Sequence, residues 1–555
     1  MGRGDTCPGE RNVWLWGGLL IGALCLLYFG FLGTIPLMEP DEGRYAEIPR
    51  EMLADGNFVT AHQAGVAYVE KPPLYYWGTA LSLSLFGINE FGARAFGTAM
   101  AIGGVLLTYW MGAVLGGRRT GLFAALVLAT SPLYYILGRL TTMDMTLAVF
   151  LTLAIISGYL VLARGRGRVY LYLAYVGVAL AFLAKGLVAV AFPVAILVLW
   201  AVSRWRWREL SRLFSPVGIG IMLALVLPWV LAVRRENPDF FWYFFIHEHV
   251  MRYTSTMHGR SRPFWYLLPF VPLGVLPWLP LVGRAWKMTR GWAGSGLERA
   301  DRWFLWTWIG FILLFYGTSH SQLITYIVPV FPPLAVLCGA RLAGWNKGTD
   351  AAPIRLQLGV GIALAATLAV LPFVARDFAI GALGIGGWLT TIAVPDLAIL
   401  AWGAVPLRLA RLGPQRTVLV SAGLLAVFWL ALNPALAVSI GEQRSGKSLA
   451  MAIKREWQPG DIVAQRGPYV QSVPFYLGQL TLVVGEHREQ DYGRAKITPE
   501  QRKWFPDEAG LRRLWASDRR MFCIFEQDAM DDIEKYYPGA RLLARSPRGI
   551  LVSNR

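Results

Sequence analysis

The sequence predicts a polytopic α-helical membrane protein with about 13 transmembrane helices, followed by a small C-terminal soluble α/β domain. Hydrophobic residues make up 55% of the 555 residues and charged residues only 16%, whereas a soluble domain carries about 25% charged residues. Apolar runs of about 20 residues, the length that crosses a bilayer, recur along positions 1–440. Beyond position 441, short strand-like runs alternate with polar, helix-like stretches, which is typical of an α/β domain.

The first apolar run, 13–33, is predicted to be a retained membrane anchor. It follows an N-terminus with Arg3 and Arg11, as the core of a signal peptide does. However, it is too long for such a core, and no A-x-A cleavage site follows it. Further spans are placed near 93–116, 120–137, 145–163, 170–184, 186–202, 215–233, 264–283, 303–319, 323–340, 356–374, 387–405 and 417–440.

Clusters of basic residues predict the orientation of these spans. Each cluster follows an even-numbered span, and cytoplasmic loops are enriched in Lys and Arg. The N-terminus is therefore predicted to be cytoplasmic and, with an odd number of spans, 441–555 is predicted to be a periplasmic domain after a transmembrane domain, 1–440. The clusters are Arg118/Arg119, Arg164/Arg166/Arg168, Arg204/Arg206/Arg208/Arg212, Arg284/Lys287/Arg290/Arg299/Arg302, Arg341/Lys347/Arg355 and Arg408/Arg411/Arg416.

This placement also explains the net charge of +18 without nucleic-acid binding, since the basic residues lie in short clusters between apolar runs. Cysteine usage indicates neither a disulfide framework nor a thiolate metal site. The four cysteines, Cys7, Cys25, Cys338 and Cys523, are scattered and form no CxxC pair.

The outward-facing connections hold the polar residues that a membrane protein should avoid. The first periplasmic loop, 34–92, contains MEPDEGRYAEIPREM and YVEKPPLYYW, and the turn after the third span contains GRLTTMDM. Lys185 stands alone between two apolar runs, and the loop 234–263 contains HEHVMRY, followed by Arg260. Under the predicted topology these groups share one side of the membrane, and ionisable groups near apolar spans mark functional pathways by default.

The DEGRYAEIPREM segment is predicted to form a short interfacial helix in the first loop. Tyr45, Ile48 and Met52 recur at near-helical spacing, and charged residues occupy the opposite face. Pro49 is expected to interrupt this helix. Asp41 and Glu42 then have two readings: a solvated cap on the helix, or carboxylates at the rim of a cavity that a charged lipid headgroup enters.

Two further candidates also keep a structural alternative. Lys71 precedes two prolines that stiffen the backbone, so it either clamps a phosphate or forms a salt bridge in a turn. Asp144 begins the fourth span, where an acidic residue also complements the helix dipole. Arg44, Lys71 and Lys185 lie on the predicted periplasmic side, where the orientation bias disfavours basic residues. For these three residues, phosphate recognition is the preferred interpretation.

His247-Glu248-His249 does not have the i, i+4 spacing of a helical zinc site. His249 and Glu70 together could still bind a divalent ion if the fold brings them together. We expect no required cofactor beyond this possible metal site.

The motifs DEGRYAEIPREM, VEKPPLYYW and GRLTTMDM resemble those of the GT-C superfamily of polyprenyl-phosphate-sugar glycosyltransferases. Within it the chain most closely resembles the family of lipid A aminoarabinose transferases (ArnT), to which the protein O-mannosyltransferases are related. The resemblance implies transfer of 4-amino-4-deoxy-L-arabinose from undecaprenyl phosphate to a phosphate of lipid A. It implies an enzyme at the periplasmic face of the bacterial inner membrane.

The resemblance also implies roles for individual residues. Asp41 is the candidate catalytic carboxylate, Asp144 a second acid of the pocket, and Arg44 and Lys71 hold the carrier phosphate. The other candidate substrate-binding residues are Tyr45, Tyr68, Glu70, Glu42, Arg139 and Lys185. The expected partners are the lipid-linked sugar, lipid A and membrane lipids, and we expect a monomer.

Two alternatives stay open. A transferase of the same architecture that acts on protein or on another glycolipid would carry the same motifs. A lipid-linked transporter or flippase is disfavoured because no matching repeat halves are found. No Rossmann G-x-G-x-x-G segment is present, which agrees with a lipid donor rather than a nucleotide sugar.

Overall fold

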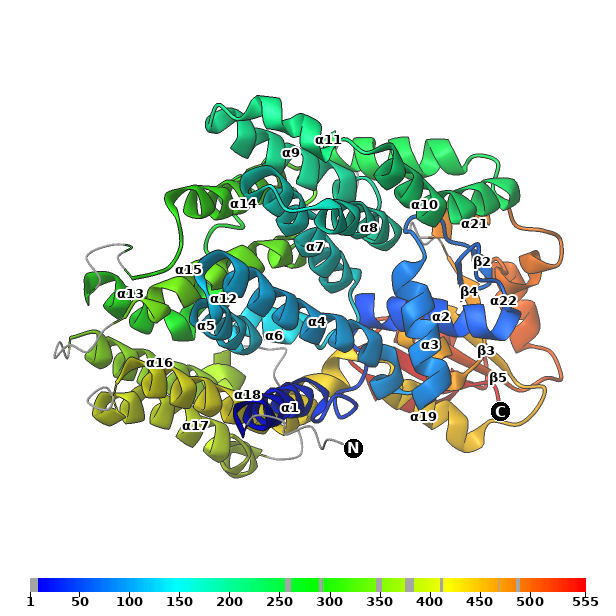
Figure 1. Ribbon diagram of the computed structural model, residues 1–555. Helices are drawn as coiled ribbons and strands as arrows, with labels where there is room; N and C mark the ends of the chain where they lie inside the picture. The colour runs from blue at the N-terminus through cyan, green and yellow to red at the C-terminus, as the bar shows by residue number, and fades with distance from the viewer. Residues whose placement is uncertain are drawn as a thin grey trace, which may run out of the picture.

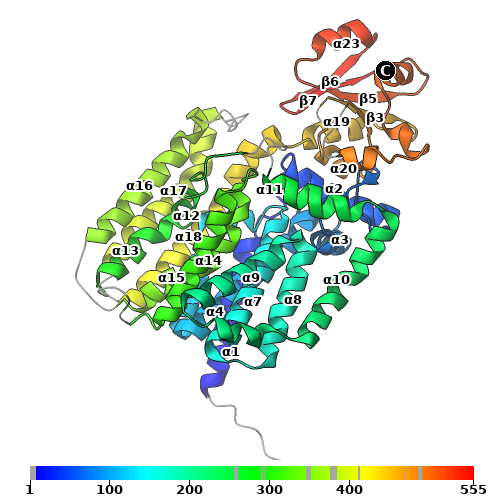
Figure 2. The same cartoon turned by 90° about the horizontal axis from the view of Figure 1, so that it is seen from above.

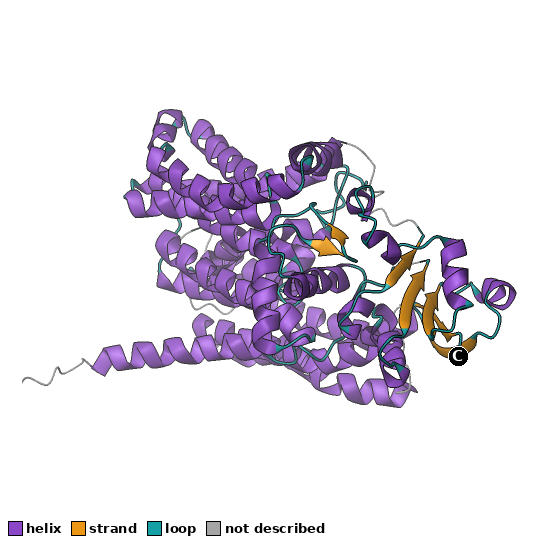
Figure 3. Ribbon diagram, turned by 90° about the vertical axis from the view of Figure 1, so that its right-hand side faces the viewer, coloured by secondary structure: helices purple, strands orange, loops and turns teal. Residues whose placement is uncertain are grey.

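The computed structural model describes residues 8–254, 261–288, 292, 294–345, 352–374, 384–409, 413–467, 469–485 and 490–555. Helices form most of the described part of the molecule, and the larger of the two sheets found there lies at one end (Figures 1 and 3). The major helices before the C-terminal domain are α1 (Pro8–Phe29), α2 (Asp41–Asp55), α3 (Leu74–Phe86), α4 (Glu90–Gly116), α5 (Arg118–Thr130), α6 (Pro132–Leu137), α7 (Met143–Arg164), α8 (Arg168–Lys185), α9 (Val188–Ser203), α10 (Pro216–Glu236), α13 (Leu279–Met288), α14 (Arg299–Gly317), α15 (Phe331–Ala343), α16 (Ala352–Val374), α17 (Gly384–Leu409) and α18 (Pro414–Arg444).

Each predicted span contains helical structure. Within the described ranges, 7 helical segments are long and apolar enough to cross a membrane, and shorter apolar helices accompany them. The polytopic class is thereby supported, and the number 13 stays a prediction. α7 is the most deeply placed of the single-helix spans; it packs against α4, α8 and α9 (Figure 2).

Proline breaks three predicted spans, because it removes a backbone donor and clashes with the preceding turn. The span 120–137 divides at Ser131–Pro132 into α5 and α6. The span 264–283 is not one helix but turns, α12 (Phe270–Gly274), a 3₁₀ turn η3 (Leu276–Trp278) and α13. The span 323–340 begins as a 3₁₀ helix, η4 (Ile324–Val330), before α15.

The first loop folds into α2, a hairpin of β1 (His62–Gln63) and β2 (Val66–Ala67), and α3. Pro49 does not interrupt α2, which runs through it. Its buried residues pack against α3 and against α20 (Ser472–Leu477) of the C-terminal domain, and we attribute the continuity to this packing. In the loop 234–263, a π-helix η2 (Trp242–Met251) and a short α11 (Arg252–Thr254) follow α10. The predicted residue Arg260 lies outside the described residues.

The segment after α18 forms a five-stranded mixed sheet with the order β4-β3-β5-β7-β6. β3 (Ile462–Arg466), β4 (Leu482–Val484) and β5 (Met521–Phe525) are parallel, and β7 (Gly549–Ser553) pairs antiparallel with β5 and β6 (Arg541–Ser546). β5 is buried along its whole length, as the centre of a sheet covered on both faces requires. The helices are α19 (Lys447–Glu456), α20, α21 (Asp491–Arg494), α22 (Glu508–Trp515) and α23 (Met530–Tyr536).

A seam of polar contacts joins this domain to the segment before α2. The Glu39 carboxylate accepts hydrogen bonds from the backbone N–H groups of Gln471 at 2.9 Å and Ser472 at 2.7 Å. The Tyr476 hydroxyl accepts one from the N–H of Leu37 at 2.8 Å. Gly43 lies so close that a Cβ there would stand 2.6 Å from the Ser472 nitrogen, so this contact requires glycine.

The charged face of α2 is buried in the structure, so the reading of a solvated cap is wrong for Glu42, whereas Asp41 stays 55% exposed. Arg50 forms a two-bond ion pair with Glu47 at 2.6 and 2.7 Å and donates to the carbonyl of Gly478. Glu51 accepts the N–H groups of Ala64 and Gly65 in the hairpin. The C-terminal domain and the hairpin cover the face that spacing alone assigns to water.

Candidate functional site

A cavity of 680 Å³ opens between the first loop and the helical bundle. It is lined by α2, the loop before α3, the turn before α7, the junction of α8 and α9, η2, the end of α14 and η4. The structure therefore brings together segments that are more than 250 positions apart in the chain, from Asp41 to Tyr326. The predicted site residues that line it are Asp41, Glu42, Arg44, Tyr45, Tyr68, Glu70, Lys71, Asp144, Lys185 and His249.

Asp41 and Arg44 form an ion pair one turn apart on α2. The Arg44 side chain is 5% exposed and that of Asp41 is 55% exposed, so the carboxylate is the partner that remains open to the cavity. The Arg44 guanidinium also lies 5.0 Å from the ring centre of Tyr45. This geometry gives the cavity one accessible acid beside a base that is held in place.

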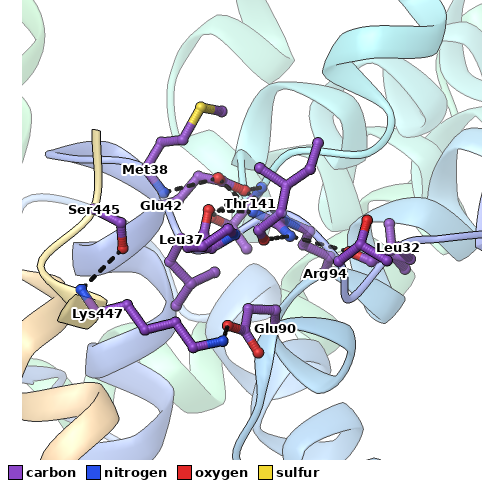
Figure 4. Close-up of polar contacts among 12 residues, drawn as sticks. Leu32, Leu37, Met38, Glu42, Glu90, Arg94, Thr141, Ser445 and Lys447 are labelled. Carbon is purple, nitrogen blue, oxygen red and sulfur yellow. Dashed lines mark hydrogen bonds and ion pairs between the residues drawn. The ribbon is translucent and has the colours of Figure 1, made fainter. Parts of the chain in front are cut away.

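Glu42 forms a buried network of hydrogen bonds. It pairs with Arg94 of α4 at 2.8 and 2.9 Å, and it accepts the N–H groups of Met38 and Thr141 (Figure 4). Arg94 in turn donates to three backbone carbonyls, at Leu32, Ile35 and Pro36. The carboxylate of Glu42 thus holds α2 to the turn before α7, and Glu42 also lines the cavity.

Lys71 lies among acids. Its Nζ is 3.4 Å from the Glu248 carboxylate and 4.0 Å from that of Glu70, and it donates to the Glu70 carbonyl at 3.2 Å. Tyr68 donates to Glu70 at 3.0 Å. Lys71 thus forms the salt bridges that the structural alternative expects, yet it lines the cavity and is 12% exposed.

Asp144 and Lys185 form a second ion pair at the opposite wall. Thr142 caps α7 by accepting the Asp144 N–H, and its hydroxyl donates to Asp144 Oδ2 at 3.1 Å. The Lys185 ammonium lies 4.2 Å from the ring centre of Tyr326. Asp144 therefore sits in the first turn of a helix, as the dipole reading expects, and also faces the pocket.

Arg139 does not line the cavity, contrary to the predicted substrate role. Its guanidinium is buried in the bundle, where it donates to the carbonyls of Leu27 and Tyr28 in α1 and to Asn433 in α18. The ring of Tyr135 lies 5.3 Å away. Arg139 ties α1 and α18 to the turn before α7, and its position gives no support to substrate binding.

The structure places both members of the suggested metal pair, Glu70 and His249, at the cavity. His249 Nδ1 bonds to the carbonyl of Phe244 at 2.6 Å, and Nε2 accepts the N–H of Leu187 at 3.2 Å, so both ring nitrogens are occupied. Burial lowers the pKa of His249, which keeps the imidazole neutral. Within the described ranges no group of three His, Cys, Asp or Glu side chains could hold a metal ion.

The arrangement suits an anionic ligand. Arg44, Lys71 and Lys185 converge on one cavity, and each keeps an acidic partner that prevents an excess of uncompensated charge. Apolar and aromatic residues from α9, α14 and η4 line the remaining wall, as a lipid chain requires. Glu248 and Tyr326 were not predicted; Glu248 lay inside the rejected zinc motif and Tyr326 inside an apolar span.

Comparisons with known proteins agree with this architecture. The family model for dolichyl-phosphate-mannose-protein mannosyltransferases matches residues 20–244, and that for the aminoarabinose transferase C-terminal domain matches residues 449–554. The crystal structure of ArnT from Cupriavidus metallidurans bound to undecaprenyl phosphate superposes with a TM-score of 0.85 at 28% identity, over 97% of this chain and 98% of that one. Its apo form gives a TM-score of 0.84 at 27% identity, over 98% of each chain.

Curated relatives carry the name undecaprenyl phosphate-α-4-amino-4-deoxy-L-arabinose arabinosyl transferase. Those from Edwardsiella ictaluri and Aeromonas salmonicida are 35% and 36% identical over 64% and 62% of this chain, and the chain spans 65% and 64% of their lengths. The relative from Erwinia tasmaniensis is 33% identical over 72% of this chain and 75% of its own length. Since this relative is 33% identical and covered to 75% of its length, and the C-terminal domain has its own family match, the chain belongs to the ArnT family of aminoarabinose transferases.

Proposed function

We propose that the protein transfers 4-amino-4-deoxy-L-arabinose from undecaprenyl phosphate to a phosphate of lipid A. The observation that carries the proposal is the convergence of Arg44, Lys71 and Lys185 with the open carboxylate of Asp41 in one cavity. The names of the relatives supply the sugar and the carrier.

In the proposed reaction an oxygen of the lipid A phosphate attacks C1 of the aminoarabinose. The bond between C1 and the undecaprenyl phosphate oxygen breaks, and undecaprenyl phosphate leaves with the bonding electrons. Arg44 and Lys71 stabilise the negative charge that develops on this leaving group. Their fixed positions in the cavity favour this role, because a preorganised charge needs no reorganisation during the reaction.

Asp41 is proposed to orient rather than to remove a proton. A phosphate monoester with a second pKa of about 6 is largely ionised at neutral pH, so this acceptor has no proton that must leave. Asp41 then pairs with the ammonium of the sugar or steers the attacking phosphate. The reaction is proposed to need no resident metal ion.

A transferase acting on protein is the second candidate, because the mannosyltransferase family model matches residues 20–244. The match of residues 449–554 to the aminoarabinose transferase C-terminal domain favours the first candidate. The two differ in the acceptor, since a hydroxyl acceptor needs a general base.

We further propose that the protein lies in the inner membrane as a monomer, with the N-terminus in the cytoplasm. The cavity and the C-terminal domain then face the periplasm, which places the basic loops on the cytoplasmic side as the orientation bias requires.

The test is mass spectrometry of lipid A from cells with and without the gene. We expect a mass increase of one aminopentose that depends on the gene and is lost in the Lys71→Ala variant. Unchanged lipid A, together with a newly glycosylated protein, would favour the second candidate instead.

A further inference from the structure

A second pocket lies at the far end of the bundle, between the end of α9 and the start of α14. α7 connects the two ends. Asp144 in its first turn lines the large cavity, and Arg164 in its last turn pairs with Asp301 of α14 at 2.8 Å. An α-helix of 22 residues is about 33 Å long, which is close to the thickness of a bilayer core. The second pocket therefore belongs to the opposite face of the protein from the proposed active site.

This pocket has a volume of 390 Å³ and gathers three arginines, Arg204, Arg299 and Arg302. In the described part of the chain, no carboxylate forms an ion pair with any of the three. The acids nearest in sequence to Arg299 and Arg302, Glu298 and Asp301, pair with Arg164 instead. The acid nearest to Arg204, Glu209, pairs with Arg206 and Arg212. Three like charges in one pocket repel one another, so an anion bound between them would be stabilised.

Tryptophans form the other wall. Trp303 donates to Ser203 at 2.8 Å and so joins α14 to α9 at the pocket. Trp303 and Trp306 lie one turn apart on α14, and each is 49% exposed. Exposed indole rings are typical of the level at which lipid headgroups meet the bilayer core.

An apolar surface continues from the pocket along α9. Val202, Leu199 and Val198 are exposed on the last turns of this helix, next to the arginine at its end. A free phosphate ion would contact only the arginines, whereas a phospholipid would contact the arginines with its headgroup and α9 with an acyl chain. The combination of the two surfaces favours the lipid.

We propose that this pocket binds the headgroup of an anionic phospholipid. The planar guanidinium of arginine matches a phosphodiester with two parallel hydrogen bonds, and the N-terminus of α14, which carries Arg299 and Arg302, adds a favourable dipole. Basic pockets between membrane helices at the cytoplasmic side are suited to such headgroups. Under the topology proposed above, the lipid comes from the cytoplasmic leaflet, so this site is distinct from that of the carrier lipid.

The test is native mass spectrometry of the full-length protein in detergent, titrated with phosphatidylglycerol or phosphatidylcholine. We expect phosphatidylglycerol to bind more tightly than phosphatidylcholine. The triple variant Arg204→Gln, Arg299→Gln, Arg302→Gln should bind phosphatidylglycerol about 100-fold more weakly, because each base contributes about 1 kcal/mol and roughly 1.4 kcal/mol corresponds to a tenfold change in affinity. The matched control changes three exposed bases in other basic loops, Arg118, Arg168 and Arg208, to glutamine. It should leave the affinity nearly unchanged.

Two further measurements test the binding of a phospholipid at this pocket. The single variant Arg299→Gln changes an exposed side chain, so it should fold normally and bind about fivefold more weakly. Inorganic phosphate in millimolar excess should not displace phosphatidylglycerol. Equal binding of both lipids, an equal loss in the control variant, or displacement by inorganic phosphate would each overturn the assignment of a phospholipid site.

Discussion

Replacing Glu42 with alanine removes a carboxylate that accepts hydrogen bonds from Arg94, from Met38 and from Thr141. The Glu42 and Arg94 side chains are 5% and 3% exposed, so the variant leaves a buried guanidinium without its counter-charge. Breaking a buried pair in this way costs about 3–5 kcal/mol of folding free energy. We expect Glu42→Ala to unfold at a clearly lower temperature and to lose transfer activity only as a consequence.

The assay compares thermal unfolding in detergent with single-turnover transfer for the same preparations. Glu209→Ala serves as the control, because Glu209 pairs with Arg206 and Arg212 at 34% and 52% exposure, and surface pairs contribute about 0–1 kcal/mol. The double variant Glu42→Leu, Arg94→Met should regain only part of the stability. An apolar pair removes the uncompensated charge, but it leaves unpaired the backbone groups that Glu42 and Arg94 bond. A Glu42→Ala protein that unfolds like wild type but is inactive would refute the structural role of Glu42.

Four further outcomes are expected. Lys71→Ala should lose most transfer activity, and Lys71→Arg should recover little, because a planar fork does not replace a compact charge. Wild-type turnover in Lys71→Ala would exclude the phosphate clamp. Asp41→Asn should be severely impaired, and the rate of single-turnover transfer by the wild type should follow the ionisation of the acceptor phosphate at about pH 6. A rise of the wild-type rate with pH that is absent in Asp41→Asn would instead indicate that Asp41 is a general base. Burial raises the pKa of Glu39 to about 7, so between about pH 5 and pH 7 the folded state holds a proton that the unfolded state has lost, and the folding stability should fall as the pH rises through this range. The unfolding temperature of Glu39→Gln should not show this fall, and an unchanged fall would assign it to other groups. Reporter fusions after Arg168 and Arg416 should read as cytoplasmic and fusions in the C-terminal domain as periplasmic; a cytoplasmic C-terminus would contradict the predicted helix count.

The cavity-lining residues could be predicted because charge bias assigns each loop to a side of the membrane. The motifs around Asp41, Lys71 and Asp144, together with Lys185, fall on one predicted side, and in the structure all four line one cavity. What loop charge does not encode is the direction in which a side chain points. Arg139 shares the predicted side with the others, yet it turns into the bundle toward the carbonyls of α1.

Two other differences have a similar cause. Arg94 falls at the start of an apolar span, and its partner Glu42 lies in another motif, so their pairing depends on tertiary contacts that neither segment reveals. The charged face of α2 looks solvated from spacing because the domain that covers it begins about 400 positions later. β6 is hard to predict from the sequence, since half of its residues are exposed and it lacks the apolar run that marks the other strands of the C-terminal sheet.

The seam between the C-terminal domain and the start of α2 has a consequence for the biogenesis of the enzyme. Leu37 contacts a residue 439 positions later, and Glu39 contacts one 433 positions later. At a synthesis rate of about 5–20 residues per second, the contact partners of the α2 segment emerge roughly 20 to 90 s after it. The helix that carries Asp41 and Arg44 therefore reaches its final surroundings only when the C-terminal domain has been made. The nascent protein thus passes through membrane insertion with an incomplete site, and its last domain to fold determines when the enzyme becomes competent.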